Sequence, residues 1–501
     1  MIRTLGNAAS LSPTLTRRMW LAVILLGLVG QLAWVVENMY LNVFIYDTIT
    51  TDPRVTATLV ASSAIAATLA TMFIGALSDK IGKRKAFITG GYILWGLSTA
   101  AFGFIQVDGE AGVIKDAVAL AVLAVITLDC IMSFLGSGAN DAAFQAWVTD
   151  NTNPSNRGRI DGVMVIMPLV AMLIVFGGFD SLTRAGEWRT FFAIFGLLVI
   201  VVGIASWWLI DDNAGIAKAD QKYFAQVVEG LRPSTMRKRK ALYSVLLTWL
   251  IWATSVQVFM PYLIIYIREY LDIEGYAIVL ATVLTLASIA SVIAGRLIDR
   301  IGKVQFLIPA GIIYGTGLVL MFFLQSFAGA MIAGTVMMSG FMFVNAALSA
   351  LTRDASPVDS AGQTQGLRMI CSVMLPSIVG PFLGALAIRG SANTYEELGV
   401  VKDVPTPIIF LAALGVSALS FLPALWLRNV HKKAADVVAA PGNAEGLDGA
   451  GTAIAPTDGA GAAIAPTDGA GTAETAPSNL VASSDFADTS EPDTHNESTH
   501  A

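Results

Sequence analysis

Long apolar runs recur along most of this chain, and they constrain its fold more than any other feature. Each run has about 20 residues or more, enough to cross the ~30 Å hydrocarbon core of a bilayer. Hydrocarbon offers the backbone no hydrogen-bond partner, so such runs must form helices. The chain is 55% hydrophobic and 14% charged, whereas a soluble domain carries about 25% charged residues. The sequence therefore predicts an all-α, polytopic membrane protein.

We expect twelve transmembrane helices, in two six-helix groups separated by one longer loop. The predicted spans are residues 19–46, 54–78, 86–106, 117–148, 161–182, 190–210, 242–267, 276–298, 304–326, 330–351, 366–388 and 406–428. They define an N-terminal six-helix bundle, a cytoplasmic central loop, a C-terminal six-helix bundle and a tail, at residues 1–210, 211–241, 242–430 and 431–501.

The tail differs from the bundles in composition. It is acidic, poor in aromatic residues and rich in Gly, Ala, Pro and Thr, and residues 449–458 nearly repeat as 459–468. Such a segment cannot bury enough apolar surface to become ordered. We predict a disordered cytoplasmic tail. The net charge of −6 arises there, so it does not indicate a basic partner, and we expect no nucleic acid.

Lys and Arg are concentrated in one set of loops. They follow the second, fourth and twelfth spans and precede the seventh, whereas the alternate loops hold acids such as Asp52, Asp108 and Glu396. Cytoplasmic loops carry the excess of Lys and Arg in membrane proteins. We therefore predict a multi-pass protein of the cell (plasma) membrane with both termini in the cytoplasm.

A charged signature occurs twice, 220 residues apart. Residues 75–83 read Gly-Ala-Leu-Ser-Asp-Lys-Ile-Gly-Lys, and residues 295–303 read Gly-Arg-Leu-Ile-Asp-Arg-Ile-Gly-Lys. The glycines permit close helix approach and a tight turn. Asp79 and Asp299 stand at helix ends, where they can pair with a cation or a helix N-terminus. Two copies in register predict a duplicated bundle, in which substrate binds between the halves near the bilayer midplane.

The connection between the fourth and fifth spans carries further charges. Asp150 precedes Arg157 there, and Asp354 matches Asp150 in the second half at an offset of 204 residues. These charges can cap helices and fix topology, or they can form ion pairs that close the cytoplasmic side in one state only. The predicted cytoplasmic gate comprises Asp79, Arg84, Asp150, Arg157, Asp299 and Arg300.

The first span has a polar and aromatic face, with residues three or four positions apart. This face consists of Gln31, Trp34, Glu37, Asn38 and Asn42. An intramembrane carboxylate is costly and faces a cavity or a partner. Glu37 is therefore a candidate for binding a proton, although a structural hydrogen bond to a neighbouring helix is the alternative.

The fourth span carries a polar stripe with one residue every four positions. Its members are Asp129, Ser133, Ser137, Asp141 and Gln145, flanked by Asn140 and Trp147. Such a stripe is hard to explain as lipid-facing. Asp141 is the stronger functional candidate, and Asp129 is either functional or a structural partner of a neighbouring helix.

The second half offers amides and aromatics at the matching positions. Gln257 corresponds to Glu37, and Asn345 corresponds to Asp141. This asymmetry predicts proton coupling in the first half and hydrogen bonding to a ligand in both. Aromatic rings and amides suit a sugar, whose faces stack and whose hydroxyls form hydrogen bonds. The predicted substrate and proton site comprises Glu37, Asp141, Trp34, Asn38, Asn42, Asn140, Gln257, Tyr262 and Asn345.

The duplicated signature resembles the loop motif between helices 2 and 3 of the major facilitator superfamily, and its copy between helices 8 and 9. Residues 150–159 resemble the acid-to-Arg-Gly segment of many sugar-transporting members. The resemblance covers about residues 1–430 and implies the twelve-helix major facilitator fold, with transport by alternating access.

A narrower resemblance is local. Residues 39–47 and 141–159 look like the end of helix 1 and the helix 4 to helix 5 segment of the glycoside–pentoside–hexuronide branch of sugar:cation symporters. Asp141 stands where that family tends to have Asn, and Ala143 where it tends to have Pro. The second span also has no acid like that family's cation site. These departures favour protons over sodium as the coupling ion.

We therefore predict a secondary active transporter, not an enzyme. The chain has no Gly-x-x-x-x-Gly-Lys-Ser/Thr loop for ATP, and its three His lie outside the spans, so we expect no cofactor and no metal. The predicted solute is a small polar molecule, a sugar or glycoside moved with protons. Proton-driven efflux of an amphipathic or cationic compound is the alternative, and a non-transporting sensor or scaffold is a remoter one. We expect a monomer in the lipid bilayer.

Overall fold

The computed structural model describes residues 16–105, 114–152, 157–212, 232–273, 275–355, 361–390, 394–397 and 400–428. These residues are nearly all helical, which confirms the predicted all-α class. All of them belong to one compact unit that ends at Asp458. A second unit, Gly459–Ala501, lies outside the described residues, as do the whole predicted tail and residues 213–231 of the central loop.

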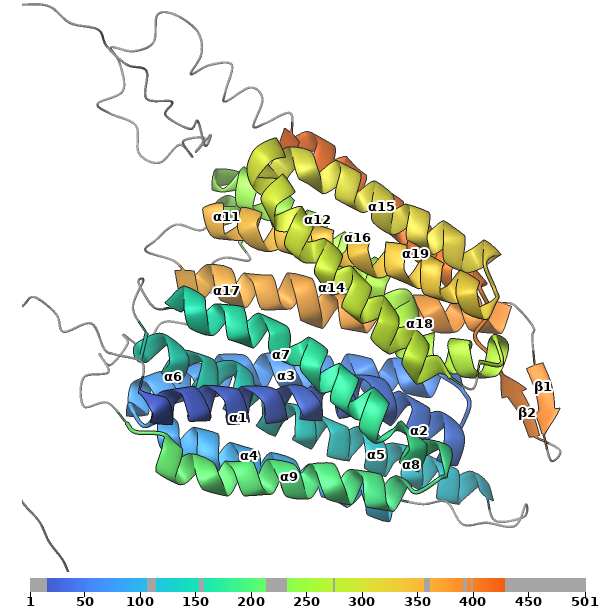
Figure 1. Cartoon of the computed structure of the whole chain (residues 1–501), viewed down its shortest axis with the longest axis horizontal. Helices are drawn as coiled ribbons and strands as arrows, with labels where there is room; N and C mark the ends of the chain where they lie inside the picture. The colour runs from blue at the N-terminus through green and yellow to red at the C-terminus, as the bar shows by residue number, and fades with distance from the viewer. Residues whose placement is uncertain are drawn as a thin grey trace, which may run out of the picture. The chain divides into compact units, whose positions relative to one another are not determined.

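The first half of the chain is drawn in blue to green in Figure 1. Its elements are α1 (Arg17–Val35), η1 (Val36–Tyr40), α2 (Leu41–Thr48), α3 (Pro53–Ile81), α4 (Arg84–Ala101), η2 (Phe102–Phe104), α5 (Ile114–Gly136), η3 (Ser137–Phe144), α6 (Gln145–Asp150), α7 (Arg157–Gly178), α8 (Asp180–Arg184) and α9 (Trp188–Leu209). Consecutive elements such as α1, η1 and α2 continue one another, so each predicted span corresponds to one long helical segment.

The second half repeats this pattern. Its helical elements are α11 (Pro233–Lys238), α12 (Lys240–Phe259), η4 (Met260–Tyr262), α13 (Leu263–Ile265), η5 (Tyr266–Tyr270), α14 (Tyr276–Ile301), α15 (Lys303–Phe323), α16 (Phe327–Asp354), α17 (Ala361–Met369), η7 (Ile370–Met374), α18 (Leu375–Gly390) and α19 (Ile408–Leu419). One departure from an all-helical chain is a small antiparallel hairpin of β1 (Thr394–Glu397) and β2 (Val400–Asp403), which lies in the connection between α18 and α19.

Within the described residues, ten helices are long and apolar enough to cross a membrane. Two shorter apolar helices, Ile166–Gly178 and Tyr276–Val292, lie where the fifth and eighth spans are predicted. Together they account for the twelve predicted spans. Large apolar side chains such as Trp208 and Val292 are exposed on these helices, as a lipid-facing surface requires.

Several of the long helices contain a π-helical segment. The segments η1, η3, η5 and η7 interrupt the first, fourth, seventh and eleventh spans. Such turns are rare in proteins overall, and those that occur are often located at functional sites. Glu37 lies in η1 and Asp141 lies in η3, so both acids of the predicted site occupy a locally widened helix.

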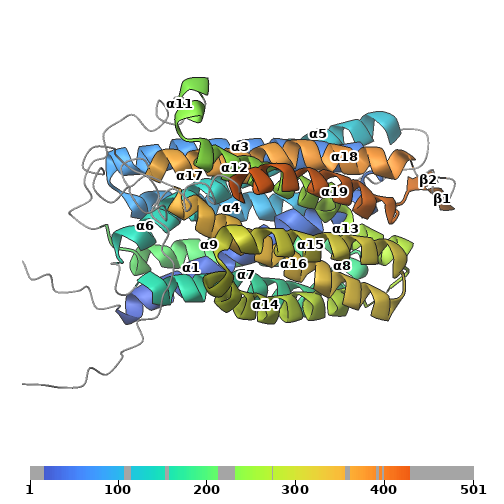
Figure 2. The ribbon, with the colours of Figure 1, turned by 90° about the horizontal axis from the view of Figure 1, so that it is seen from above.

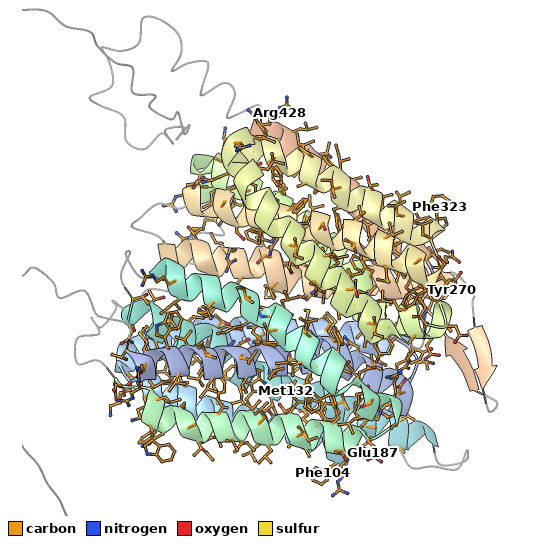
Figure 3. All side chains as sticks on the ribbon, in the orientation of Figure 1. Phe104, Met132, Glu187, Tyr270, Phe323 and Arg428 are labelled. Carbon is orange, nitrogen blue, oxygen red and sulfur yellow. The ribbon has the colours of Figure 1, made fainter. Side chains whose placement is uncertain are left out.

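The bundle has two distinct ends. In Figure 1, α6, α11 and α17 lie at one end, and α2, α8 and the β-hairpin lie at the other. We call the first the basic end, because it carries Arg84 and Lys303, and the second the opposite end. Figure 3 labels Arg428 at the basic end and Tyr270 and Phe323 at the opposite end.

The second glycine of each signature makes the predicted turn at the basic end. Gly82 follows α3 with φ +69°, and Gly302 separates α14 from α15 with φ +92°. Positive φ values are accessible to glycine because it has no Cβ. The prediction of a tight glycine turn in both copies is therefore confirmed.

The two halves meet through specific helix pairs. Helix α3 packs on α18, and α7 packs on α14; Figure 2 shows the first pair side by side. Within the first half, α4 and α9 approach so closely that a Cβ placed on Gly96 would lie 2.5 Å from the carbonyl oxygen of Gly196. Small residues allow this approach in membranes, where close van der Waals packing drives helix association.

Candidate functional site

Glu37 lies inside the first half, against the fourth span. Its side chain is 6% exposed, and its Oε1 accepts a hydrogen bond of 2.5 Å from the Ser133 hydroxyl of α5. Its other oxygen, Oε2, is buried and has no partner within the described residues. This contact therefore joins the polar faces predicted on the first and fourth spans.

Asp129 lies one helical turn before Ser133 on the same face of α5, since residues four apart are neighbours on a helix surface. It is only 1% exposed, and its carboxylate interacts electrostatically with Glu37. Ser63 of α3 approaches it, but neither carboxylate oxygen has a hydrogen-bond partner in the described part of the chain. Burying a charged carboxylate without hydrogen-bond donors costs free energy. Asp129 is therefore a candidate for a functional role.

Asp141 has the opposite environment, because its oxygens are well provided with neutral donors. Ser137 donates to Oδ2 at 3.1 Å, and the Asn140 amide donates to Oδ1 at 3.0 Å. The Trp34 side chain also interacts with this carboxylate. The amide oxygen of Asn140 in turn accepts from the Tyr92 hydroxyl at 2.8 Å. These donors can stabilise a charged carboxylate at this position.

An aromatic wall stands beside Asp141. The rings of Trp34 and Trp95 lie 5.4 Å apart, and those of Tyr92 and Trp95 lie 5.6 Å apart. Trp34 and Asp141 are partly accessible, whereas Trp95 and Tyr92 are fully buried. A partly accessible indole next to a carboxylate can stack on an apolar ring face while the acid accepts hydrogen bonds.

The two predicted asparagines of the first span support the π turn. The Asn38 amide donates to the carbonyl oxygen of Trp34 at 2.9 Å, and the Asn42 amide donates to that of Asn38 at 2.9 Å. Polar side chains commonly satisfy backbone carbonyls released at such irregularities. Asn38 is exposed and can also meet a solute, whereas Asn42 is 2% exposed and serves the helix itself.

The second-half candidates do not form one cluster. The Gln257 amide donates to the Ser377 hydroxyl of α18 at 2.6 Å. Tyr262 is buried, and its hydroxyl lies 2.9 Å from the carbonyl oxygens of both Pro53 and Pro381, so it joins the halves towards the opposite end. Asn345 is an exposed residue of α16. Of these three residues, Asn345 has the accessible amide.

At the basic end, the structure brings together two of the predicted gate residues. Arg84 is 4% exposed; its Nε lies 3.2 Å from the Asp150 carboxylate, and its Nη1 donates to the Ser78 hydroxyl at 2.6 Å. Lys303 and Asp354 form the corresponding pair of the second half, at 2.5 Å. Each pair lies within one half.

For three of the remaining gate residues the structure describes only the backbone, and the fourth is exposed. Asp79 is in the last turns of α3, Asp299 is in α14, and Arg157 begins α7, but their side chains lie outside the described part. Arg300 is exposed at the end of α14. Their predicted gating role stays a prediction.

Ion pairs join the two halves at the opposite end, where the sequence analysis placed no gate. Arg268 of η5 pairs with Asp47 of α2, and Arg389 of α18 lies 2.9 Å from Asp52. The available signal is the isolated arginines in loops that are otherwise acidic. It was missed because those loops were used only to assign orientation.

Asp180 forms a second link at the same end. It accepts hydrogen bonds from Tyr40 of the first half and Tyr276 of the second, and Arg184 pairs with it at 3.0 Å. The carboxylate is 2% exposed. Buried charges are tolerated when they are paired and hydrogen-bonded, so this contact is a specific junction between α8 and α14.

The described residues contain no group of three or more His, Cys, Asp or Glu placed to hold a metal ion. The family comparison decides the class. The sequence model of the Major Facilitator Superfamily matches residues 19–381 and 253–467. The chain belongs to this superfamily. It is therefore a membrane transporter and not an enzyme, and its partners include a small-molecule substrate and the lipid bilayer.

Solved structures support the same fold for this transporter. A mutant form of the nucleoside transporter NupG is similar with a TM-score of 0.62 at 13% identity, over 81% of this chain and 99% of that one. A bacterial homolog of the human lysosomal transporter Spinster, in an inward-facing and unoccupied conformation, has a TM-score of 0.59 at 14% identity, over 82% and 96%. No curated protein matches the sequence. The superfamily prediction is confirmed, and the sugar:cation branch stays a prediction.

Proposed function

We propose that this transporter moves a sugar or glycoside together with protons by alternating access. The observation that carries the proposal is the division of acids in the first half. Glu37 and Asp129 are buried together with almost no donors, whereas Asp141 is partly accessible and surrounded by donors. One environment suits proton binding, and the other suits hydrogen bonding to hydroxyl groups.

The solute class follows from the accessible groups. Trp34 provides a ring face, and the side chains of Asn38, Asp141 and Asn345 provide donors and acceptors. Sugars need this combination, because they have apolar faces and many hydroxyls. The fold is also that of NupG, whose name states that it carries nucleosides. Nucleosides are N-glycosides, so they fall within the class proposed for this chain.

The contacts between the halves fit one state of the transport cycle. The Arg268–Asp47 and Arg389–Asp52 ion pairs and the Tyr262–Pro53 hydrogen bond join the halves at the opposite end. If the basic end is cytoplasmic, as the Lys and Arg distribution predicts, these contacts close the external side.

One observation favours the efflux alternative. The second half contains an apolar pocket between η5, α14, α15 and α16, lined by residues such as Ile267, Val283, Met321 and Met338. Its lining is apolar, as the surroundings of the apolar part of an amphipathic compound would be.

A binding screen on the purified protein distinguishes these functions. Ligands that bind the folded state raise its apparent thermal stability. Monosaccharides, O-glycosides, nucleosides and amphipathic cations are tested separately, and each stabilising compound is then taken into proteoliposomes with an imposed pH or sodium gradient. We expect a glycoside to stabilise the protein and to accumulate under the pH gradient.

Other results would change the assignment. Stabilisation by amphipathic cations alone, with expulsion driven by protons, would establish efflux. Accumulation that follows the sodium gradient and ignores the pH gradient would reject proton coupling. As a matched control, Trp34→Ala should reduce the stabilisation, whereas replacement of the lipid-facing Trp208 by Ala should leave it unchanged.

A further inference from the structure

On two neighbouring acids of the first half, three buried carboxylate oxygens lack a hydrogen-bond partner within the described residues. They are Oε2 of Glu37 and both oxygens of Asp129. Buried polar side-chain atoms nearly always have a partner in proteins. Three exceptions on two neighbouring acids therefore point to a bound species at this place.

The two acids share one environment. Ser133 occupies only Oε1 of Glu37, at 2.5 Å, and Asp129 lies one turn before Ser133 on α5. Both carboxylates are more than nine-tenths buried. Because Glu37 interacts electrostatically with Asp129, each senses the charge of the other.

The surroundings supply no compensating positive charge in the described part of the chain. The titratable groups that act on the pair are Asp141 of η3 and the Cys130 thiol of α5. From α3, Ser62 and Ser63 contribute only neutral hydroxyls. Tyr92 of α4 is neutral and interacts with Asp141.

Two like charges in such a site repel one another, and each also loses its hydration. A single proton removes the repulsion, because it leaves only one negative charge on the two acids. The acid that binds it becomes neutral and no longer needs its hydration. A pair of carboxylates that shares a site and one proton is a known arrangement in other proteins.

We propose that Glu37 and Asp129 form an interacting acid pair that binds a single proton, and that this pair is the proton-binding element of the transporter. The inference rests on the proposed function and deepens it. Asp141 is thereby assigned to the solute, and Asp129 becomes a proton-site residue that the predicted site did not include. Ser133 is a positioning residue that orients Glu37.

The test labels protonated carboxyl groups without using any solute. Dicyclohexylcarbodiimide is apolar and reacts with protonated carboxyls in membranes, giving a stable N-acylurea. The purified full-length protein is labelled over a series of pH values, and peptides are mapped by mass spectrometry. We expect one adduct per chain, on Glu37 or Asp129, with a yield that falls as the pH rises.

Single variants test whether the two acids act as a pair. In Asp129→Asn, the pH midpoint for labelling Glu37 should move, and in Glu37→Gln the midpoint for Asp129 should move. Interacting sites titrate as a unit, so removing one changes the other. Asp141→Asn is the matched control, because that acid has its own donors, and it should move the midpoint less.

Infrared spectroscopy of the unmodified protein gives a reading that does not depend on variants folding or on reagent access. The C=O stretching band of a protonated carboxyl should be present at neutral pH and disappear in alkaline buffer. Absence of this band at neutral pH, two independent adducts per chain, or unmoved midpoints in both variants would overturn the acid pair. So would protection of the pair by sodium at constant pH, which would identify a sodium site.

These outcomes are separate from those of the transport proposal. The acid pair can fail while a glycoside still binds and accumulates, in which case protons bind elsewhere. Conversely, the pair can be established while every glycoside fails in the binding screen, in which case the solute class is wrong and the proton site remains.

Discussion

The two halves of this transporter share their ends but differ in their interiors. At the basic end, each half has a positive-φ glycine and a cation–acid pair, namely Arg84–Asp150 in the first and Lys303–Asp354 in the second. In the interior, the first half has the carboxylates of Glu37, Asp129 and Asp141, whereas the second half has Gln257 and Asn345 at the positions that match Glu37 and Asp141.

This difference shows which features both copies of a duplicated bundle must keep and which can diverge. Loops at a membrane surface must turn tightly and present cations on one side, so both copies keep Gly, Asp and Lys there. Interior positions are free to specialise, because a charge inside the membrane is kept only where function requires it. Our proposal assigns proton binding to the first half, whereas the matching interior positions of the second half are neutral.

The substitution with the largest expected effect tests whether proton binding is confined to the interior of the first half. Glu37→Gln should abolish accumulation of the solute, reducing the internal-to-external ratio to unity, because an amide cannot bind and release a proton. Downhill exchange should persist, since Asp141 and Trp34 remain. The measurement compares gradient-driven uptake with exchange in proteoliposomes, using the solute found by the binding screen.

A substitution in the second half, at the position that matches Asp141, provides the control. Asn345→Ala should weaken uptake and exchange together, because it removes a hydrogen-bonding group from the solute. Wild-type accumulation in Glu37→Gln, or selective loss of accumulation in Asn345→Ala, would break the proposed division.

Replacing the second glycine of each signature by alanine should destabilise the protein to different extents in the two halves. Gly302 has φ +92° and ψ +139°, close to a region that is open essentially to glycine alone, and an alanine there should cost up to about 3 kcal/mol. Gly82 has φ +69° and ψ +23°, a left-handed conformation in which alanine should cost roughly 1 kcal/mol. Reversible unfolding in mixed detergent micelles measures both.

Gly90→Ala is the control for this pair, because Gly90 lies within α4 and a Cβ there meets no atom within 4 Å. It should be neutral or stabilising. Equal losses for Gly82→Ala and Gly302→Ala would show that the two copies are equivalent despite their different backbone angles.

The two ion pairs of the basic end should also contribute unequally to the free energy of unfolding. Arg84 is 4% exposed and has two partners, so Arg84→Ala should cost about 2 kcal/mol. The side chains of Lys303 and Asp354 are 34% and 45% exposed, and Lys303→Ala should cost at most about 1 kcal/mol. Unfolding at low and high salt distinguishes them, because salt screens the exposed pair more strongly.

Arg300→Ala, at an exposed position beside the second pair, controls for loss of a cation alone. A larger loss in Lys303→Ala than in Arg84→Ala would contradict the burial argument.

A smaller effect is expected where the halves meet. Tyr262→Phe removes the hydroxyl that bonds to Pro53, which should weaken closure of the opposite end by about 1 kcal/mol, or roughly fivefold in the ratio of states. A reporter cysteine at Thr56, a buried position in α3, should react faster with an impermeant maleimide. Cys130 and Cys371 are first replaced by Ser.

Tyr266→Phe is the matched control, because its hydroxyl lies 3.5 Å from the carbonyl oxygen of Met321 within the second half. It should leave the reaction rate unchanged. Equal acceleration in both variants would mean that general loosening, and not release of the contact between halves, exposes the reporter.

No effect is expected outside both halves. Deletion of residues 440–501 should leave uptake and thermal stability unchanged, since its composition offers no core. Loss of membrane insertion in this truncation would show that the tail takes part in folding. The full-length protein, expressed in parallel, is the reference.

Much of this division could be predicted from the sequence. Spans of about 20 apolar residues leave helices as the one viable structure in a bilayer, and the repeated signature relates the halves. The polar face around Glu37 was also visible, because side chains three and four apart share a side of a helix.

Other features depend on contacts between distant segments. The importance of Asp129 follows from its lack of donors beside Glu37, 92 positions away in the chain, which no local pattern reveals. The π turns at Glu37 and Asp141 depend on how carbonyls released within the bundle find new partners, such as the Asn38 amide.

Sequence by itself determined the membrane class, the number of spans, the internal duplication and the turns at the basic end, because each depends on local hydropathy or on the backbone freedom of glycine. Only the tertiary structure decided which acids are isolated, which are supplied with donors, and where the halves join. Burial and pairing are properties of packed neighbours: Arg268 and Asp47 are 221 positions apart and still form one ion pair.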